Sequence, residues 1–278
     1  MAVGGVLALT ASGSWVTLSR AASADSIRWL VFYGESADEA ALAGYNIIIL
    51  DPGYRGSIPK IVARGPRVCG YLSLCEIRTS DPLFGALDPS VLLEPNPEWP
   101  GTRRVDIRNP SWRSFILEIA IPSITAAGFD GLMFDTLDTS AYLEATDPVR
   151  YRGMRAAAVE LVGVIRERCP NMMLIMNRGY ELLPQLVQKI DALIVESLLT
   201  VPDQRGGFVF ADPIEVKREI ALLKPATQRQ PPLPVLSLDY WDPGDVKTIA
   251  EIYRRERDLG HHPYVAGRLL DRIVPEAR

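Results

Sequence analysis

The chain has 278 residues, of which 47% are hydrophobic and 23% are charged, and its formal net charge is −4. This balance is typical of a globular protein with a large core, and it excludes disordered, collagen-like and coiled-coil chains. No block of lysine and arginine occurs, so we do not expect nucleic acid as a partner.

The first 24 residues are predicted to be a signal peptide or an N-terminal extension. Residues 1–19 carry no charge, and Ala22-Ser23-Ala24 has the form of a cleavage site. The segment holds too many Ser, Thr and Gly residues for a membrane-spanning helix, and no later apolar run is long enough for one. We expect a monomeric mature chain over residues 25–278, without an integral membrane segment. It is secreted or periplasmic, or cytoplasmic if the segment is not a signal peptide.

From Ile27 onward, short apolar runs alternate with helical stretches. The runs lack polar alternation, as strands buried on both faces should. The predicted strands are Arg28–Tyr33, Asn46–Leu50, Arg67–Leu74, Gly131–Phe134, Met172–Met176, Ala192–Val195, Pro234–Leu238 and Pro263–Ala266. Capping residues before proline predict helix starts at Asn109-Pro110, Asp147-Pro148, Asp212-Pro213 and Asp242-Pro243, and the clearest helix is expected over Pro148–Arg168.

Eight strands alternating with helices predict a single-domain α/β fold, a (β/α)8 TIM barrel. One connection breaks the pattern: residues 76–108 contain five prolines and no helical period. Because this connection follows a strand, we expect it at the C-terminal face of the barrel, where it forms a wall of the binding cleft.

Polar side chains follow seven of the eight strands. Carboxylates are costly to bury unpaired, so these residues indicate a shared cleft at one rim. The polar positions are Tyr33-Gly34-Glu35, Asp51-Pro52, Ser73 with Glu76, Asp135 with Asp138, Asn177-Arg178, Glu196-Ser197 and Asp239-Tyr240-Trp241. A rim of this kind suits a neutral or cationic polyhydroxylated ligand, and the absence of a Gly-rich phosphate loop disfavours phosphorylated ones.

Asp135 and Glu196 are the candidate catalytic residues. Each ends a wholly apolar strand, where a purely structural design would place a hydrophobe, Gly or Asn. Two carboxylates facing one cleft match the needs of a glycosidase, in which one acts on the anomeric carbon and the other protonates the leaving oxygen. The predicted substrate-binding residues are Tyr33, Asp51, Tyr71, Glu76, Asp138, Asn177, Asp239 and Tyr240.

The sequence contains few histidine and cysteine residues that could bind a metal or a cofactor. Three cysteines and two adjacent histidines occur, without the spacing of a zinc site. We therefore expect no metal and no cofactor.

Seven motifs resemble, in order, the endo-α-1,4-polygalactosaminidase family, which is glycoside hydrolase family 114 with its related bacterial exopolysaccharide hydrolase barrels. The resemblance covers about residues 27–271. The motifs are GYLSLCE (70–76), RRVDIRNPSW (103–112), GFDGLMFDTLD (128–138), MNRGYELLP (176–184), IVESL (194–198), LDYWD (238–242) and HPYVAGRLLD (262–271).

The resemblance implies an extracytoplasmic barrel that hydrolyses α-1,4 links between galactosamine or N-acetylgalactosamine units. It matches Asp135 to the strand-four acid and Glu196 to its strand-six partner. Analogy with related α-glycoside barrels makes Asp135 the nucleophile and Glu196 the general acid/base. The alternative is a non-catalytic carbohydrate-binding barrel, in which both acids serve only as hydrogen-bond acceptors.

Overall fold

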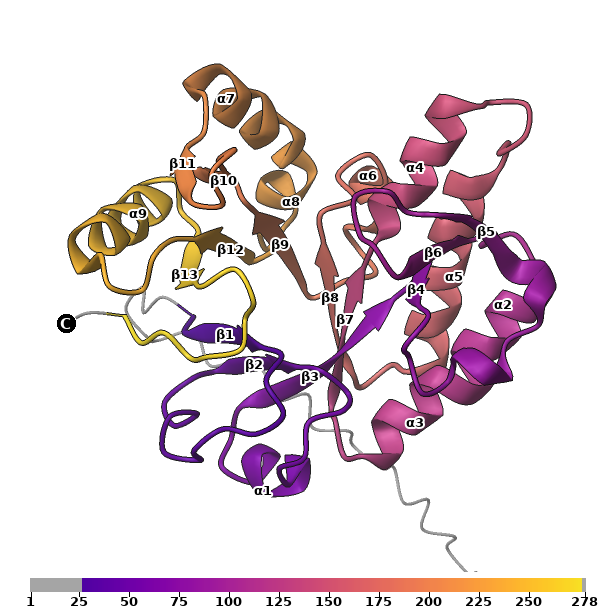
Figure 1. Ribbon diagram of the computed structural model, residues 1–278, viewed down its shortest axis with the longest axis horizontal. Helices are drawn as coiled ribbons and strands as arrows, with labels where there is room; N and C mark the ends of the chain where they lie inside the picture. The colour runs from indigo at the N-terminus through magenta and orange to yellow at the C-terminus, as the bar shows by residue number, and fades with distance from the viewer. Residues whose placement is uncertain (1–26, 277–278) are drawn as a thin grey trace, which may run out of the picture.

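The computed structural model describes residues 27–276 and has the architecture of a (β/α)8 barrel, with helices around the outside of the strands (Figure 1). Eight parallel strands form one sheet in the order β1-β2-β3-β7-β8-β9-β12-β13. They are β1 (Trp29–Phe32), β2 (Ile47–Leu50), β3 (Arg67–Ser73), β7 (Gly131–Asp135), β8 (Met173–Asn177), β9 (Ala192–Glu196), β12 (Val235–Tyr240) and β13 (His262–Ala266). The predicted fold class and all eight predicted strands are confirmed. The predicted signal peptide lies outside the described residues.

The helices follow the strands in chain order, and two of the four predicted helix starts are correct. Asn109 accepts a hydrogen bond from Ser111 N at the start of α2, and Asp212 accepts one from Ile214 N at the start of α7. The helices are α1 (Ile58–Val62), α2 (Pro110–Phe115), α3 (Ile121–Ala126), α4 (Leu137–Thr146), α5 (Met154–Arg168), α6 (Leu183–Leu186), α7 (Pro213–Leu222), α8 (Lys224–Gln228) and α9 (Val246–Asp258), with a π-helical turn, η3 (Ile116–Ala120), between α2 and α3.

The other two predicted starts are wrong, because their aspartates form turns instead of caps. Asp147 accepts bonds from Val149 N and Arg150 N, and α5 begins only after Gly153, whose φ of 88° is left-handed. Asp242 accepts a bond from Gly244 N, and α9 is capped three residues later by Asp245. An aspartate before proline therefore marks a change of direction more surely than it marks a helix.

Residues 76–108 are more ordered than the predicted loop. They form a small antiparallel sheet of order β4-β6-β5, made of β4 (Glu76–Arg78), β5 (Leu92–Pro95) and β6 (Thr102–Val105). Two 3₁₀ turns, η1 (Phe84–Ala86) and η2 (Pro89–Val91), connect β4 to β5. A second insertion is the hairpin of β10 (Thr200–Pro202) and β11 (Phe208–Phe210), which follows β9.

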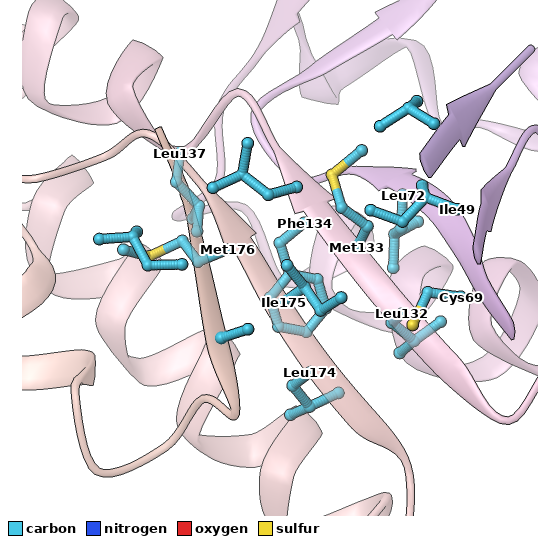
Figure 2. Close-up of a cluster of buried hydrophobic side chains, with 14 of the residues drawn as sticks. Ile49, Cys69, Leu72, Leu132, Met133, Phe134, Leu137, Leu174, Ile175 and Met176 are labelled. Atoms are coloured by element: carbon cyan, nitrogen blue, oxygen red, sulfur yellow. The ribbon is translucent and has the colours of Figure 1, made fainter. Parts of the chain in front are cut away.

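The core fills the barrel and the layer between strands and helices. Strand residues such as Leu132, Phe134, Leu174 and Ile175 are fully buried and pack beside Cys69 and Leu72 of β3 (Figure 2). The first and last strands meet through His262, whose carbonyl accepts from Trp29 Nε1 (2.7 Å) and whose Nδ1 accepts from Ile27 N (2.9 Å). The closed arrangement brings the carboxyl ends of all eight strands to one face.

Candidate active site

Asp135, Asn177 and Glu196 are the last residues of three neighbouring strands, β7, β8 and β9. Successive side chains of a strand point to opposite faces, so residues two apart share a face. In β7 the inward positions end at Asp135, after Met133 and Gly131, and the same alternation brings Asn177 and Glu196 to the barrel mouth. The sheet thereby places two carboxylates and an amide side by side.

The Asn177 side chain joins the two carboxylates. Its Nδ2 donates to Asp135 Oδ1 at 3.0 Å and to Glu196 Oε2 at 2.8 Å. Asn177 is only 6% exposed, and its Oδ1 is buried without a partner in the described structure. Buried polar atoms are nearly always paired, so this unpaired acceptor is an exception among the described residues.

Two tyrosines occupy the other oxygen of each carboxylate. Tyr71 donates from its hydroxyl to Asp135 Oδ2 at 2.9 Å, and Tyr240 donates to Glu196 Oε1 at 2.6 Å. Burial, and then the charge of the carboxylate beside it, raises the pKa of each phenol well above its usual range. Both tyrosines therefore stay protonated and act as fixed donors.

Tyr33 completes this part of the mouth. Its ring lies edge-on to the ring of Tyr71, with centroids 5.5 Å apart. Burial raises the pKa of Tyr33, followed by the charges of Asp135, Glu196 and Asp51, which places its hydroxyl in the field of both candidate acids. Six of the ten predicted site residues thus form one cluster: Tyr33, Tyr71, Asp135, Asn177, Glu196 and Tyr240.

The backbone is left-handed immediately after each of the three strand-end residues. Thr136, Arg178 and Ser197 have φ of 63°, 52° and 58°. Non-glycine residues seldom adopt this conformation, and it persists where surrounding contacts hold it. At Thr136 such contacts are present, since Thr136 Oγ1 accepts from Cys75 N (2.9 Å) and bonds Ser73 Oγ (2.8 Å). Each strand therefore turns sharply away just after its functional side chain.

Asp138 and Asp51 lie at the rim with arginine neighbours. Asp138 Oδ2 is 3.7 Å from Arg178 Nε, while Asp51 Oδ2 accepts from Arg78 Nη2 at 2.9 Å. Burial and the charge of Asp135 raise the pKa of Asp138 to about 6, against the opposing effect of Arg178. Asp138 therefore changes charge in the mildly acidic range.

The structure places the other two predicted substrate-binding residues away from the cluster, which corrects the expectation for them. Glu76 is 3% exposed, and its carboxylate accepts from Asn96 Nδ2 and Thr139 Oγ1, so it fastens the small sheet to α4. Asp239 is 1% exposed and accepts from Leu199 N and Thr200 N. Its neighbour Tyr240 takes the inward position of β12, so Asp239 faces outward.

Two further residues at the site are not among the predicted substrate-binding residues, although the sequence analysis placed Arg178 at the rim. Arg178 Nη1 donates to the carbonyl of Glu196 at 3.2 Å, so its guanidinium lies beside the candidate acid. Its position directly after Asn177 was the available signal. Phe208 of the β10–β11 hairpin stacks on Tyr240 with centroids 5.9 Å apart, and nothing in its own sequence predicted this contact.

A hollow of about 450 Å³ adjoins the cluster on the side of the hairpin. Phe208 and Trp241 line it, together with Gly267 and Leu269 from the loop after β13. Phe208 also stacks on Tyr240, so this one ring contacts both the hollow and the cluster.

Over residues 27–276, no group of three or more His, Cys, Asp and Glu side chains is arranged to hold a metal ion. Among the helices of that same range, none has the length and apolar character needed to cross a membrane.

Comparisons with known proteins identify similar sequences and structures. Residues 10–277 match the model of glycoside-hydrolase family GH114. An uncharacterised protein of Deinococcus radiodurans is 27% identical over 265 residues, which cover 88% of this chain and 80% of that protein. The glycoside hydrolase domain of PelA from Pseudomonas aeruginosa has a TM-score of 0.80 at 22% identity, over 91% of this chain and 99% of that one.

A second solved structure has a similar fold. It is Aspergillus fumigatus Ega3 in complex with galactosamine, with a TM-score of 0.67 at 15% identity, over 94% of this chain and 100% of that one. At these identities the solved structures support the barrel architecture, while the family match extends over nearly the whole chain.

Proposed function

The chain belongs to glycoside-hydrolase family GH114, and from this premise we propose that it hydrolyses α-1,4 linkages in a polysaccharide containing galactosamine or N-acetylgalactosamine. Glycoside hydrolysis is the activity of the family, and the α-1,4 linkage and the amino sugar are what we propose for this chain. Support for the sugar comes from the galactosamine bound to Ega3, which has a similar fold.

The bridge that Asn177 makes between Asp135 and Glu196 is the observation that carries the proposal. Both hydrogen bonds leave one nitrogen atom, so the two bonded oxygens lie no farther apart than a 3.0 Å and a 2.8 Å bond allow. Carboxyl groups of inverting glycosidases stand roughly 6.5–9.5 Å apart, whereas those of retaining enzymes stand about 5–5.5 Å apart. The spacing favours a retaining mechanism.

In that mechanism Asp135 is the nucleophile and Glu196 is the general acid/base. Glu196 gives its proton to the glycosidic oxygen as the Asp135 carboxylate bonds to the anomeric carbon and the leaving sugar departs. Glu196, now ionised, takes a proton from water, and the resulting hydroxide attacks the anomeric carbon and releases Asp135. Tyr71 and Tyr240 keep the two carboxylates oriented through both steps.

An amino sugar also suits the charges around the site. Asp138 and Asp51 bring carboxylates to the rim, and above a pH of about 6 Asp138 is ionised and attracts an ammonium group. Arg78 and Arg178 partly offset this charge, which leaves room for the acetylated form as well.

Product analysis by mass spectrometry tests the proposal. The full chain, Asp135→Asn and Glu196→Gln are each incubated with acetylated and de-acetylated α-1,4-galactosaminan. We expect oligosaccharides from the wild type and at least about 1,000-fold fewer from either variant. A wild type that binds these polymers without cutting them favours the alternative, a carbohydrate-binding barrel.

The place of action follows from the substrate, because exopolysaccharide lies outside the cytoplasm. We propose a secreted or periplasmic monomer, in line with the uncharged apolar sequence of residues 1–19. Fractionation of cells producing the full chain tests this, and sedimentation of the purified protein gives its oligomeric state.

A further inference from the structure

Asp239 holds the segment that follows the Glu196 strand. Its Oδ1 accepts three hydrogen bonds, from Leu199 N (3.0 Å), Thr200 N (2.9 Å) and Thr200 Oγ1 (3.0 Å). Leu199 and Thr200 lie three and four residues after Glu196, where the chain leaves β9 and enters the β10–β11 hairpin. One buried oxygen atom therefore fixes the start of the hairpin.

The same contact reaches the donor of Glu196. Thr200 Oγ1, while donating to Asp239, accepts from Tyr240 N at 3.1 Å. Tyr240 in turn donates its hydroxyl to Glu196 Oε1. Glu196 is thus held from two directions that both depend on Asp239: along its own strand and through Tyr240.

The second oxygen of Asp239 faces another carboxylate. Glu256 on α9 is fully buried, and its Oε2 lies 2.6 Å from His261 Nδ1. Asp239 Oδ2 and Glu256 Oε1 are both buried, and neither has a donor in the described structure. Two ionised carboxylates in contact without water would repel strongly, so one proton between them satisfies both atoms.

The proton belongs on Asp239. Burial raises the pKa of Asp239 well above its usual range, and the charge of Glu256 and a hydrogen bond with it raise it further. Besides each other, Asp239 on β12 and Glu256 on α9 have one further side-chain partner each: Thr200 on β10 bonds to Asp239, and His261, just before β13, bonds to Glu256. The other oxygen of Glu256 already has His261 as its hydrogen-bond partner, which leaves Oε1 as the acceptor for Asp239.

We propose that Asp239 is a positioning residue: as a neutral carboxylic acid it donates its proton to Glu256, while its other oxygen holds the Leu199–Thr200 turn that orients Glu196 and Tyr240. The effect on catalysis rests on the proposed glycosidase function, whereas the protonation does not. An outward-facing aspartate thereby acts on the active site from behind the sheet.

Asp239→Asn is the decisive variant. An asparagine keeps an oxygen for Leu199 and Thr200, and its amide donates to Glu256 at every pH. We expect wild-type folding and a kcat within about twofold of wild type. Asp239→Ala removes both functions, and we expect kcat to fall about tenfold or more with little change in KM, since small displacements of catalytic groups are costly. Glu251→Gln, an exposed change on α9, the helix that carries Glu256, is the matched control.

Two measurements that need no substrate test the proton directly. The difference between the infrared spectra of wild type and Asp239→Asn should contain the carbonyl band of a buried protonated carboxyl, and the difference between wild type and Glu251→Gln should lack it. Because the pKa of Asp239 is raised in the folded protein, its protonated form contributes to the free energy of unfolding, and this contribution is lost as pH rises above about 4, the pKa of an aspartate in the unfolded chain. Denaturant midpoints should therefore shift in favour of Asp239→Asn as pH increases from 4 to 8.

These outcomes separate the inference from the proposed function. No carboxyl band in the difference between wild type and Asp239→Asn, or a midpoint difference that does not change with pH, overturns the neutral Asp239. An Asn variant as impaired in kcat as the Ala variant overturns the positioning role. If no polymer is cut by any form, the proposed function fails while the spectra and midpoints still decide the protonation.

Discussion

Asn177 and the carboxylates that it bridges are the residues on which the proposed chemistry depends. Substituting Asn177 with Ala removes the donor to both acids, so we expect kcat to fall about 100-fold because the acids lose their fixed geometry. Asn177→Asp should be worse, since a third carboxylate in contact with two others repels them. Steady-state kinetics on the cleaved polymer measure the effect.

Asn171→Ala, on the exposed turn before β8, is the matched control and should retain wild-type activity. An Asn177→Ala enzyme with normal kcat would show that the bridge is dispensable.

Asp138 gives the site a pH dependence of its own. Its pKa of about 6 means that it is neutral below this pH and charged above it. We expect KM for the de-acetylated polymer to fall as pH rises through about 6, because the charged form attracts the ammonium group. In Asp138→Asn that change should disappear, and the acetylated polymer should display little of it in either protein.

The predicted site residues at the ends of β7, β8 and β9 lie side by side in the structure, whereas Glu76 and Asp239 lie away from them. Both show in the sequence as a carboxylate after an apolar strand. The direction of the side chain depends on the register of the strand end, and adjacent positions such as Asp239 and Tyr240 point oppositely. Composition at a strand end therefore identifies the rim but not the inward residue.

At the scale of elements, close packing between neighbouring strands limits the size of the side chain that fits at Gly131 in β7. A Cβ at Gly131 would lie 2.3 Å from Cys69 Sγ and 2.9 Å from the Met173 carbonyl. Gly131→Ala should lower the free energy of unfolding by about 1–3 kcal/mol through overpacking, measured by chemical denaturation.

Gly163→Ala on α5 is the matched control. A Cβ there has only Lys189 Nζ nearby, at 4.0 Å, so the helix should gain about 0.5–1 kcal/mol from the better helix former. Equal effects of the two changes would contradict the packing argument.

The elements that the sequence predicted least well are those held by contacts rather than by periodicity. Strands β4–β6 pair with one another across the prolines of residues 76–108. The β10–β11 hairpin is secured by Asp239 from a strand far along the chain. Short, half-exposed strands have little periodicity, so only their pairing reveals them.

At the scale of the whole molecule, His262 helps to join the first and last strands of the barrel. Burial lowers the pKa of His262, and the charges of His261 and Arg257 lower it further. The Nδ1 atom of His262 accepts a hydrogen bond from Ile27 N. A depressed pKa keeps the ring neutral in the fold, so this stability is present above the unfolded pKa of about 6.5 and is lost as pH falls below it.

His262→Ala should therefore lower the free energy of unfolding by about 1 kcal/mol at pH 8. The variant should also lose less stability than wild type on acidification from 7 to 5. Arg254→Ala, an exposed change on α9, serves as control. A variant with an unchanged acid dependence would mean that His262 does not carry this linkage.

The sequence by itself determined the barrel and its polar rim, because strands buried on both faces must be apolar and must end where polar groups can meet solvent or one another. It also singled out Asp135 and Glu196 as candidates, since a purely structural design would place a hydrophobe, Gly or Asn at the end of GLMF or ALIV. Only the tertiary structure decided which of the remaining polar side chains join them. That choice depends on strand register and on partners distant in the chain, as with Asn177 between Asp135 and Glu196 and with Asp239 against Glu256.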